Sequence, residues 1–450
     1  MLKKWLVGLV ACASLLSART VAAEKIDFDQ AVDVKGIIQS LQTKVAQQTQ
    51  AEKAGVANWT VMVYINAKNN LEKFGLLNTN QMEMVGSTDK VKVAVELGRM
   101  NRYDHSDGGW KGERRYIIQK DNDTNHISSP VLQEIAKADM GDWHHLVDFV
   151  SWAKRTAPAK HYMLIVWNHG SGWLKDINQD IWLRGISYDD ESGNHLSTPD
   201  LGQALAAVGK LDIYASDACL MQMAEVGYQI KDYADYLVQS EETEPADGYT
   251  YNTLLGPLAA EPAMGSMALA KLTAQTYTEH YASAGKEATQ SVVKTAALPR
   301  LQTLLSSWAD AVMSANETAV IKSARSASQH FYYSENKDLL HFIKLVDAWS
   351  KDAAVKSQGA EIESFLAREL IIANATTGSK YKDASGLAIY IPSGSYNSHY
   401  DELAWAKDGS WGKFARWAKD IPDDGGDGDD DNGGGGNDND PGSDSLRSQR

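Results

Sequence analysis

Cysteine is nearly absent from this sequence. Its 450 residues include two cysteines, Cys12 and Cys219, and Cys12 lies inside an apparent export signal. A chain that loses this signal cannot form an internal disulfide, so disulfide bonds are excluded as a source of its stability. The single remaining thiol of an exported protein therefore needs another explanation.

Positive charge and long apolar runs are also scarce. The chain has 44 Lys and Arg against 59 Asp and Glu, which gives a formal net charge of −15. This acidity argues against nucleic acid and anionic membrane surfaces as partners, although it permits a basic substrate. After the first residues, no stretch is apolar and long enough to span a bilayer, so we expect no transmembrane segment.

The first 23 residues show the three parts of a secretory signal peptide. A charged start precedes an apolar run at Trp5–Leu16, and small residues follow at Val21–Ala23. Cleavage at this point predicts a secreted, periplasmic or extracellular protein, and a lipoprotein signal with lipidated Cys12 is the alternative. Residues 24–55 are polar and are expected to form an N-terminal arm or pro-segment.

Apolar segments and amphipathic segments alternate through the middle of the chain. This alternation is typical of an α/β fold with a mostly parallel sheet. We expect an α/β core at 56–260 and a helix-rich C-terminal part at 261–419, with a late strand at 386–391. The other strands are expected at 59–65, 91–97, 115–119, 162–167, 211–215 and 236–239. The helices of the core are expected at 71–84, 143–155, 199–208 and 220–233.

Residues 420–450 consist mostly of Asp, Gly and Asn, and we predict that they are disordered. Within them, Asp427, Asp429 and Asp431 resemble the start of a calcium-binding loop. Asn432 stands where such a loop has glycine, and no helical pattern flanks it, which favours a solvated linker. Calcium is left open as a cofactor, and no other cofactor is expected.

Cys219 lies between a predicted strand at 211–215 and a predicted helix at 220–233. It would therefore occupy the carboxyl edge of a parallel sheet, where α/β proteins build their sites. The N-terminus of a helix also favours the thiolate form of cysteine. The alternative is a small, buried core residue.

A nucleophilic thiol needs a base, and His169 is the candidate among eleven histidines. It follows the strand predicted at 162–167 in the way that Cys219 follows its own strand, and Gly170 is its neighbour. If the two strands are adjacent, the two side chains meet at one edge. His161 lies at the wrong end of its strand, and His195 is expected in a polar loop.

Five segments in a fixed order resemble the clostripain family of caspase-like cysteine peptidases. They read "WTVMVYINAKNNLE", "LIVWNHGSGW", "GISYDDESG", "DACLMQMAEVGY" and "YLVQSEETEPADGY", and the resemblance covers most of residues 58–400. It implies a caspase-like three-layer sandwich with a central, mostly parallel sheet between helices. It also implies that His169 is the general base and acid, that Cys219 is the nucleophile, and that the N–H groups of Gly170 and Cys219 form an oxyanion hole.

The family prefers a basic residue before the cleaved bond, so the resemblance implies an acidic pocket. Asp217 and Asp247 are the matching candidates, with a helix N-cap or a turn as the alternative for Asp217. For Glu241, Glu242 and Glu244 we expect a solvated loop instead. Bidentate pairing favours Arg in such a pocket, and Lys is the alternative.

Family members are often cut in the segment after the catalytic histidine. The matching segment, 170–200, is polar and rich in turns, and its basic residues are Lys175 and Arg184. Arg184 is the preferred site of self-cleavage because Arg suits the pocket and Gly185 is expected to be unhindered. The alternative is that Arg184 pairs with a nearby acid and is not cleaved. The fragments should stay associated because both supply strands to one sheet.

The sequence thus predicts a secreted cysteine endopeptidase that cleaves proteins or peptides after Arg, or after Lys as the alternative. Two further readings stay open. One is an inactive relative that binds peptides. The other is a transpeptidase or ligase that uses the same His–Cys dyad and the same acyl-enzyme.

Overall fold

The computed structural model describes residues 56–173 and 185–422. The predicted signal peptide at 1–23, the arm at 24–55, Lys175, Arg184 and the aspartates of the calcium-like loop lie outside the described residues. Among the described residues, no helix combines the length and the apolar character needed to cross a bilayer.

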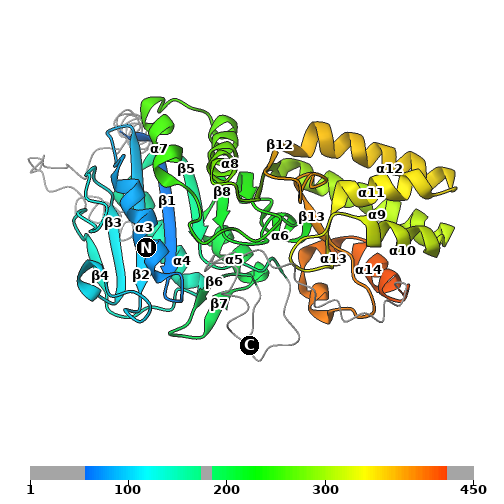
Figure 1. The fold of residues 1–450 in the computed structure, drawn as a ribbon, viewed down its shortest axis with the longest axis horizontal. Coiled ribbons are helices and arrows are strands. Elements are labelled where there is room, and N and C mark those ends of the chain that lie inside the picture. Colours follow the sequence, from blue (N-terminus) through cyan, green and yellow to red (C-terminus); the bar gives the residue numbers. More distant parts are fainter. Residues whose placement is uncertain (1–55, 174–184, 423–450) are drawn as a thin grey trace, which may run out of the picture. The chain divides into compact units, whose positions relative to one another are not determined.

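Nine strands of the described residues form one mixed sheet, in the order β12-β10-β9-β8-β5-β1-β2-β3-β4 (Figure 1). The five inner strands run parallel to one another. They are β1 (Ala57–Ala67), β2 (Val91–Arg99), β5 (Ala159–Trp167), β8 (Leu211–Asp217) and β9 (Ala234–Gln239). The outer strands β3 (Gly112–Ile117), β4 (Gln133–Ile135), β10 (Thr289–Lys294) and β12 (Ile371–Thr376) pair in antiparallel fashion.

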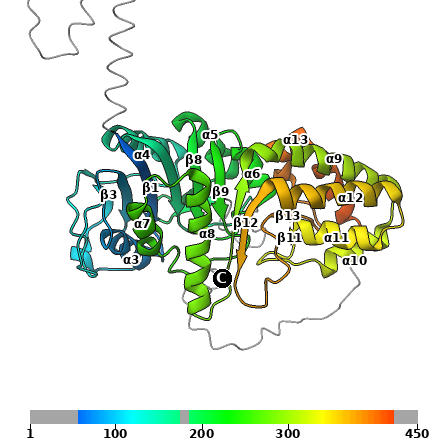
Figure 2. The ribbon, with the colours of Figure 1, turned by 90° about the horizontal axis from the view of Figure 1, so that it is seen from above.

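Helices cover both faces of the sheet, which explains why the inner strands are apolar on both sides. Figure 2 shows α4 (Trp143–Thr156) and α5 (Thr198–Val208) on one face. It shows α3 (Glu72–Glu83), α7 (Tyr251–Ala260) and α8 (Ser266–Ser283) on the other. The neighbouring residues Val63 and Tyr64 of β1 belong to the two different hydrophobic clusters, as alternation along a strand requires. The predicted α/β fold with a mostly parallel sheet is therefore confirmed.

Short local signals set the ends of these helices. Ser197 and Asp200 form a capping box at the start of α5, where Pro199 fits the first turn. The side chain of Asp142 accepts a hydrogen bond from the N–H of His144 at the start of α4. The boundaries predicted for α3, α4 and α5 lie within one residue of those in the structure.

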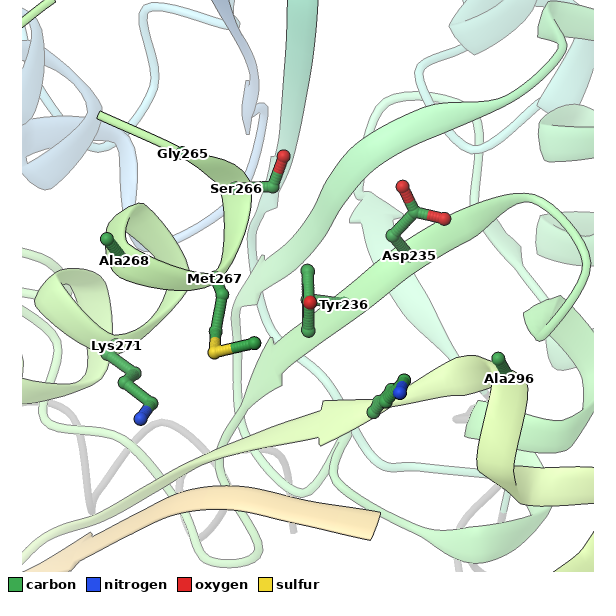
Figure 3. Close-up of a pocket in the computed structure, with 9 residues that line it drawn as sticks. Asp235, Tyr236, Gly265, Ser266, Met267, Ala268, Lys271 and Ala296 are labelled. Carbon is green, nitrogen blue, oxygen red and sulfur yellow. The ribbon is translucent and has the colours of Figure 1, made fainter. Parts of the chain in front are cut away.

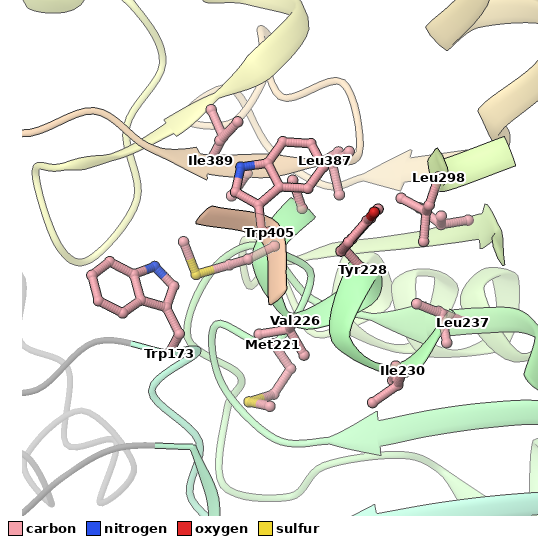
Figure 4. Packing of buried hydrophobic residues seen from close by; sticks show 14 of the residues in the cluster. Trp173, Met221, Val226, Tyr228, Ile230, Leu237, Leu298, Leu387, Ile389 and Trp405 are labelled. Carbon is pink, nitrogen blue, oxygen red and sulfur yellow. The ribbon is translucent and has the colours of Figure 1, made fainter. Parts of the chain in front are cut away.

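The C-terminal part shares its hydrophobic core with the sheet. Its helices are α9 (Leu298–Ala315), α10 (Thr318–Ala327), α11 (Leu339–Trp349), α12 (Ala353–Phe365), α13 (Ala404–Asp408) and α14 (Trp411–Lys419), and β11 (Asn336–Asp338) pairs with β13 (Ala388–Tyr390). Figure 4 shows Trp405 of α13 against Tyr228 of α6 (Ala224–Ile230), and their ring centroids are 5.4 Å apart. Leu298 and Leu237 extend the same cluster toward β9.

A buried arginine ties the end of the described chain to this part. The guanidinium of Arg325 donates hydrogen bonds to the carbonyl oxygens of Pro392, Ala418 and Ile421, at distances between 2.6 and 2.8 Å. Ile421 itself is buried. The tail predicted to begin at residue 420 is therefore still folded at this point.

The helix-rich C-terminal part predicted at 261–419 is confirmed, but it also contains two strands of the central sheet that the sequence did not predict. They are β10 and β12, which extend the sheet beyond β9. The sequence "TQSVVK" of β10 is short, and four of its six residues are polar, so it carries little strand signal of its own. Pairing with β9 and β12 determines its conformation.

Candidate active site

The structure brings His169 and Cys219 to neighbouring positions at the carboxyl edge of the sheet. Strands β5 and β8 pair in parallel, and their last registered pair is Trp167 with Asp217. His169 lies two residues after Trp167, and Cys219 lies two residues after Asp217. The two residues therefore occupy equivalent positions just beyond the ends of adjacent strands. This register is the arrangement that a dyad built from two strand ends requires.

Asn70 holds the imidazole of His169. The ring nitrogen Nε2 lies 2.7 Å from the amide oxygen of Asn70. An amide oxygen accepts only, so Nε2 carries the proton and Nδ1 keeps its lone pair. Asn70 lies in the turn between β1 and α3, where the side chain of Asn69 bonds the carbonyl of Tyr188 at 2.9 Å. Sequence reasoning missed Asn70, although its place just after the strand next to β5 was a usable signal.

Burial keeps both members of the dyad neutral in the free protein. Loss of water around the ring lowers the pKa of His169 to about 4. Burial, and then the nearby charges of Glu244 and Glu242, raise the pKa of the Cys219 thiol to about 12. The resting pair is therefore a thiol and a neutral imidazole, with the imidazole ready to act as a base.

The predicted helix N-terminus at Cys219 is wrong. The helix α6 begins at Ala224, and Leu220 adopts a left-handed conformation with φ of 64°. The N–H of Leu220 donates to the carbonyl of Glu242 at 3.0 Å, and that of Gln222 donates to Ser240 at 2.9 Å. These bonds hold the segment alongside the loop after β9, so it cannot be helical. Cys219 thus receives no help from a helix dipole, which agrees with its raised pKa.

The thiol of Cys219 rests against the loop that follows β9. The backbone N–H of Glu244 lies 3.2 Å from Sγ, and Sγ lies 3.9 Å from the carbonyl oxygen of Glu244. No hydrogen bond joins Cys219 to His169 in the described part of the chain. Proton transfer therefore requires the thiol to turn from Glu244 toward the imidazole.

Gly170 lets the two strand ends approach closely. A Cβ atom at this position would collide with the carbonyl oxygen of Cys219 and would lie 3.1 Å from the Cβ of Ala218. Among residues 56–173 and 185–422, no other residue accepts a hydrogen bond from the backbone N–H of Gly170 or from that of Cys219. Two adjacent N–H donors are thus available beside the thiol.

Asp217 is a buried residue whose oxygens already have donors. The N–H of Tyr249 lies 3.1 Å from both oxygens, and the hydroxyl of Tyr251 donates to Oδ2 at 2.8 Å. Gly248 has φ of 62°, and a Cβ atom at this position would collide with the same carboxyl group. Asp217 does not cap α6, whose N-cap is Met223. Burial raises the pKa of Asp217 to about 6.

Asp247 lies on the same loop as Glu244 and is half-buried. Its carbonyl oxygen accepts a hydrogen bond from the side chain of Asn78 at 3.0 Å. Its carboxyl group has no ion-pair partner among the described residues. The backbone of Asp247 is therefore held in place by Asn78, and its carboxyl group can contact another molecule.

The expectation of a solvated loop at Glu241, Glu242 and Glu244 is wrong. Their exposed fractions are 1%, 4% and 9%. The N–H of Gly386 donates to Glu241 at 3.1 Å, and the N–H of Tyr332 donates to Glu242 at 3.1 Å. Both donors come from the C-terminal part, which covers this loop and removes it from water.

The two ends of segment 174–184 are held close together beside the dyad. The N–H of Ser171 donates to the carbonyl of Gly185 at 2.9 Å. The ring of Trp173 packs edge-on against Tyr400, with centroids 4.7 Å apart. Gly185 is buried with φ of 92°, and a Cβ there would collide with the carbonyl oxygen of Leu196. The expectation that Gly185 is unhindered is therefore wrong.

The other two histidines considered have structural neighbours. His161 lies near the start of β5, where Nδ1 is 2.6 Å from Asp212 and the ring packs on Trp59. His195 lies in β7 (Asn194–Leu196), which pairs with β6 (Ile186–Asp189), and not in a loop. Its ring stacks on Tyr188 at 5.2 Å.

A cavity of about 600 Å³ lies at the opposite edge of the sheet (Figure 3). Its lining includes Asp235 at the start of β9 and Ser266 and Lys271 of α8. Because β9 runs parallel to β8, this edge is remote from the strand ends that carry His169 and Cys219.

In the described ranges, no group of three or more His, Cys, Asp or Glu side chains could hold a metal ion.

A sequence model of the clostripain family matches residues 63–419. The chain belongs to the clostripain family. Clostripain from Hathewaya histolytica is 31% identical over 225 residues, which are 45% of this chain and 42% of that protein, so the match spans less than half of the relative. The family membership confirms the resemblance drawn from the ordered segments.

Two solved structures of C11 cysteine proteases share the fold of this family member. One is a secreted protease from Bacteroides thetaiotaomicron in complex with an irreversible peptide inhibitor. It is 21% identical to this chain, the match covers 80% of this chain and 99% of that chain, and the TM-score is 0.59. The other is an inactive zymogen from Parabacteroides distasonis, with 21% identity, coverage of 78% and 98%, and a TM-score of 0.60. The central sheet flanked by helices is thus the fold of C11 proteases.

Proposed function

We propose that this chain is a cysteine endopeptidase that uses Cys219 as nucleophile and His169 as base. The observation that carries the proposal is the register of β5 and β8, which leaves both side chains two residues beyond one registered pair. Membership of the clostripain family supports the same assignment.

The chemistry follows from the protonation states. Nδ1 of His169 accepts the proton of the Cys219 thiol as the substrate carbonyl arrives, and the sulfur attacks that carbonyl. The N–H groups of Gly170 and Cys219 stabilise the oxyanion of the tetrahedral intermediate. The imidazolium then protonates the leaving amine, and water releases the acyl-enzyme.

The preferred substrates are proteins and peptides with a basic residue before the cleaved bond. Asp217 and Asp247 are the acidic residues proposed for this preference, with Arg ahead of Lys because its fork-shaped guanidinium suits carboxylates. Support comes from the acidic loop between β9 and α7, which contacts the thiol through Glu244. Calcium stays open as a cofactor.

Self-cleavage after Arg184, or after Lys175, belongs to the same proposal. The ends of the intervening segment are fixed by Ser171 and Trp173, so a cut would leave them in place. The fragments would also share the pairing of β5 with β8. Because Gly185 is buried, a cut after Arg184 first requires Gly185 to separate from its neighbours.

We propose that the protein is exported from the cytoplasm and acts outside it, because its first 23 residues have the pattern of a signal peptide. Lipidation at Cys12 is the alternative. The mass of the mature protein recovered from culture medium or membranes distinguishes the two.

The proposed function is tested with purified protein and paired fluorogenic peptides that end in Arg, Lys, Asp or Leu, with and without calcium. Cleavage of the Arg peptide that is lost in Cys219→Ala supports the proposal. No cleavage of any peptide by the processed wild type, or equal cleavage by Cys219→Ala, contradicts it.

A further inference from the structure

The order of the strands separates the two sides of the cleaved bond. In the central sheet β8 lies between β5 and β9, so Cys219 has His169 on one side and the loop after β9 on the other. In the proposed mechanism the imidazole protonates the leaving amine, which places the residues after the cleaved bond on the side of His169. The residues before that bond belong to the acyl group on Sγ, and they therefore extend over the loop after β9.

A segment of the C-terminal part is bonded to this loop. The N–H of Glu244 lies 3.2 Å from Sγ of Cys219. Two residues earlier on the same loop, Oε1 of Glu242 accepts a hydrogen bond from the N–H of Tyr332 at 3.1 Å. Tyr332 belongs to the connection between α10 and β11. This connection therefore borders the surface over which the upstream part of a peptide passes.

Tyr333, the next residue of the connection, also lies near the active site. Burial raises the pKa of the Tyr188 hydroxyl, and the charges of Tyr333 and Cys219 raise it further. The hydroxyl groups of Tyr188 and Ser171 lie 2.8 Å apart, and Ser171 follows the proposed base by two residues. The connection between α10 and β11 thus approaches the thiol from the C-terminal part.

Backbone hydrogen bonds fix the shape of this connection. The N–H of Phe331 donates to the carbonyl of Asn336 at 3.1 Å, and the N–H of Asn336 donates to the carbonyl of Tyr333 at 2.9 Å. Phe331 is 2% exposed, and its ring packs on Tyr381 with centroids 6.4 Å apart. Tyr332, in contrast, is 48% exposed. The connection is therefore anchored by one aromatic residue and presents the next one to solvent.

The groups around Tyr332 suit an apolar or aromatic partner. Its ring meets the ring of Tyr333 edge-on, with centroids 5.1 Å apart. The carboxyl group of Glu242 is 4% exposed and is directed into the protein, where it accepts the N–H of Tyr332. Lys380, whose charge acts on Glu242, lies over the ring of Tyr381, 4.9 Å from its centroid. Tyr332 thus offers an exposed ring, and such rings bind other aromatic and apolar side chains.

We propose that Tyr332 forms an aromatic subsite for the part of the peptide upstream of the cleaved bond, and that it selects an apolar or aromatic side chain at the third or fourth residue before that bond. The inference rests on the proposed peptidase function. Two residues of the loop and one hydrogen bond separate Glu244 from Tyr332. This corresponds to roughly 10 Å and so to about three residues of extended peptide.

The test uses purified wild-type protein and fluorogenic peptides of four residues that end in Arg. One peptide has glycine at its first three positions, and the others have phenylalanine at one of these positions. We expect phenylalanine at the third or fourth residue before the cleaved bond to raise kcat/KM by about tenfold over glycine. Tyr332→Ala should lose this gain and Tyr332→Phe should keep it. Both variants retain the backbone N–H that bonds Glu242, so they change the ring and not the loop contact.

Two controls accompany these variants. An arginine derivative with no upstream residue cannot reach Tyr332, so the wild type and both variants should cleave it equally. Tyr103→Ala is the matched control variant, because Tyr103 is 44% exposed and follows β2, on the side of His169 that lies away from Cys219. It should keep the gain from phenylalanine.

The outcomes separate this inference from the proposed function. An equal loss for every substrate in Tyr332→Ala, including the arginine derivative, means a structural role and overturns the inference. No gain from phenylalanine in the wild type, or a gain that Tyr332→Ala retains, also overturns it while the peptidase function stands. No cleavage of any peptide, or equal cleavage by Cys219→Ala, contradicts the proposed function itself.

Discussion

The ring nitrogen Nε2 of His169 lies 2.7 Å from the amide oxygen of Asn70. Asn70 belongs to the turn after β1, and His169 follows the neighbouring strand β5. The contact fixes one tautomer of the imidazole and directs Nδ1 away from Asn70. Asn70 therefore sets which nitrogen of the proposed base is free to accept a proton.

Replacement of Asn70 should affect turnover more than substrate binding. We expect Asn70→Ala to lower kcat by about 10- to 100-fold with little change in KM, since the effect is on proton transfer. Asn70→Asp should raise the pKa of His169 from about 4, because a negative charge favours the imidazolium. The acid limb of the kcat/KM profile then moves to higher pH. An unmoved limb in Asn70→Asp would contradict the positioning role.

Loss of either member of the dyad should remove peptide cleavage and leave the fold intact. Cys219→Ala and His169→Ala are each expected to lower kcat by about 10⁴-fold or more. His161→Ala is the control, because His161 lies at the start of β5 against Asp212 and Trp59. It should keep most of the activity. Circular dichroism shows whether each variant is folded, and an active, folded His169→Ala would remove His169 as the base.

The neutral resting thiol predicts slow alkylation of the free protein. With a pKa of about 12, Cys219 should react with iodoacetamide about tenfold faster for each pH unit between 7 and 10. The urea-unfolded chain is the control, because its thiol has an ordinary pKa of about 8.5 and should react much faster at pH 7. A reaction rate that is already at its plateau below pH 7 would mean a resting thiolate instead.

Self-cleavage should depend on Cys219. Wild-type protein is expected to split into two associated fragments, while Cys219→Ala stays intact. N-terminal sequencing of the second fragment distinguishes a start at Gly185, after Arg184, from a start at Asp176, after Lys175. Arg184→Ala together with Lys175→Ala should stay uncut. A cut in Cys219→Ala would assign the cleavage to another protease.

Arg325 should stabilise the C-terminal part without affecting the chemistry. Arg325→Met leaves three buried carbonyl oxygens without their donor, so we expect a loss of about 3–5 kcal/mol in the free energy of unfolding. Arg300→Met is the matched control. Its partners Glu361 and Glu369 are exposed, and we expect a loss of less than about 1 kcal/mol. Equal urea midpoints for the two variants would contradict the difference.

The parts of this fold with strong local patterns could be predicted from the sequence. The apolar strands β1, β5 and β8 are recognisable because both of their faces are buried. His169 and Cys219 could be chosen as candidates because each follows such a strand. That they lie at the same edge depended on the two strands being adjacent, and their proposed roles came from the resemblance to the clostripain family.

The parts that depend on distant contacts could not be predicted. Glu241 is buried because it bonds Gly386, which lies 145 positions later, and no local pattern reports this. The helix expected from residue 220 starts at Ala224 because Leu220 bonds the loop after β9. Asn70 is a polar residue in a turn, and its neighbour His169 is 99 positions away. Each of these features comes from tertiary structure, which overrides local propensity.

The burial of Glu241 and Glu242 has a consequence for the order of synthesis. Their donors, Gly386 and Tyr332, leave the ribosome long after Cys219 has done so. A growing chain that ends before residue 330 contains His169 and Cys219 but lacks both anchors of the loop that holds the thiol. We therefore expect truncation at residue 329 to yield an inactive protein, as assayed with the Arg peptide. Long-range contacts of this kind form late in folding, so the protein would acquire its ability to cut peptides only when synthesis is nearly complete.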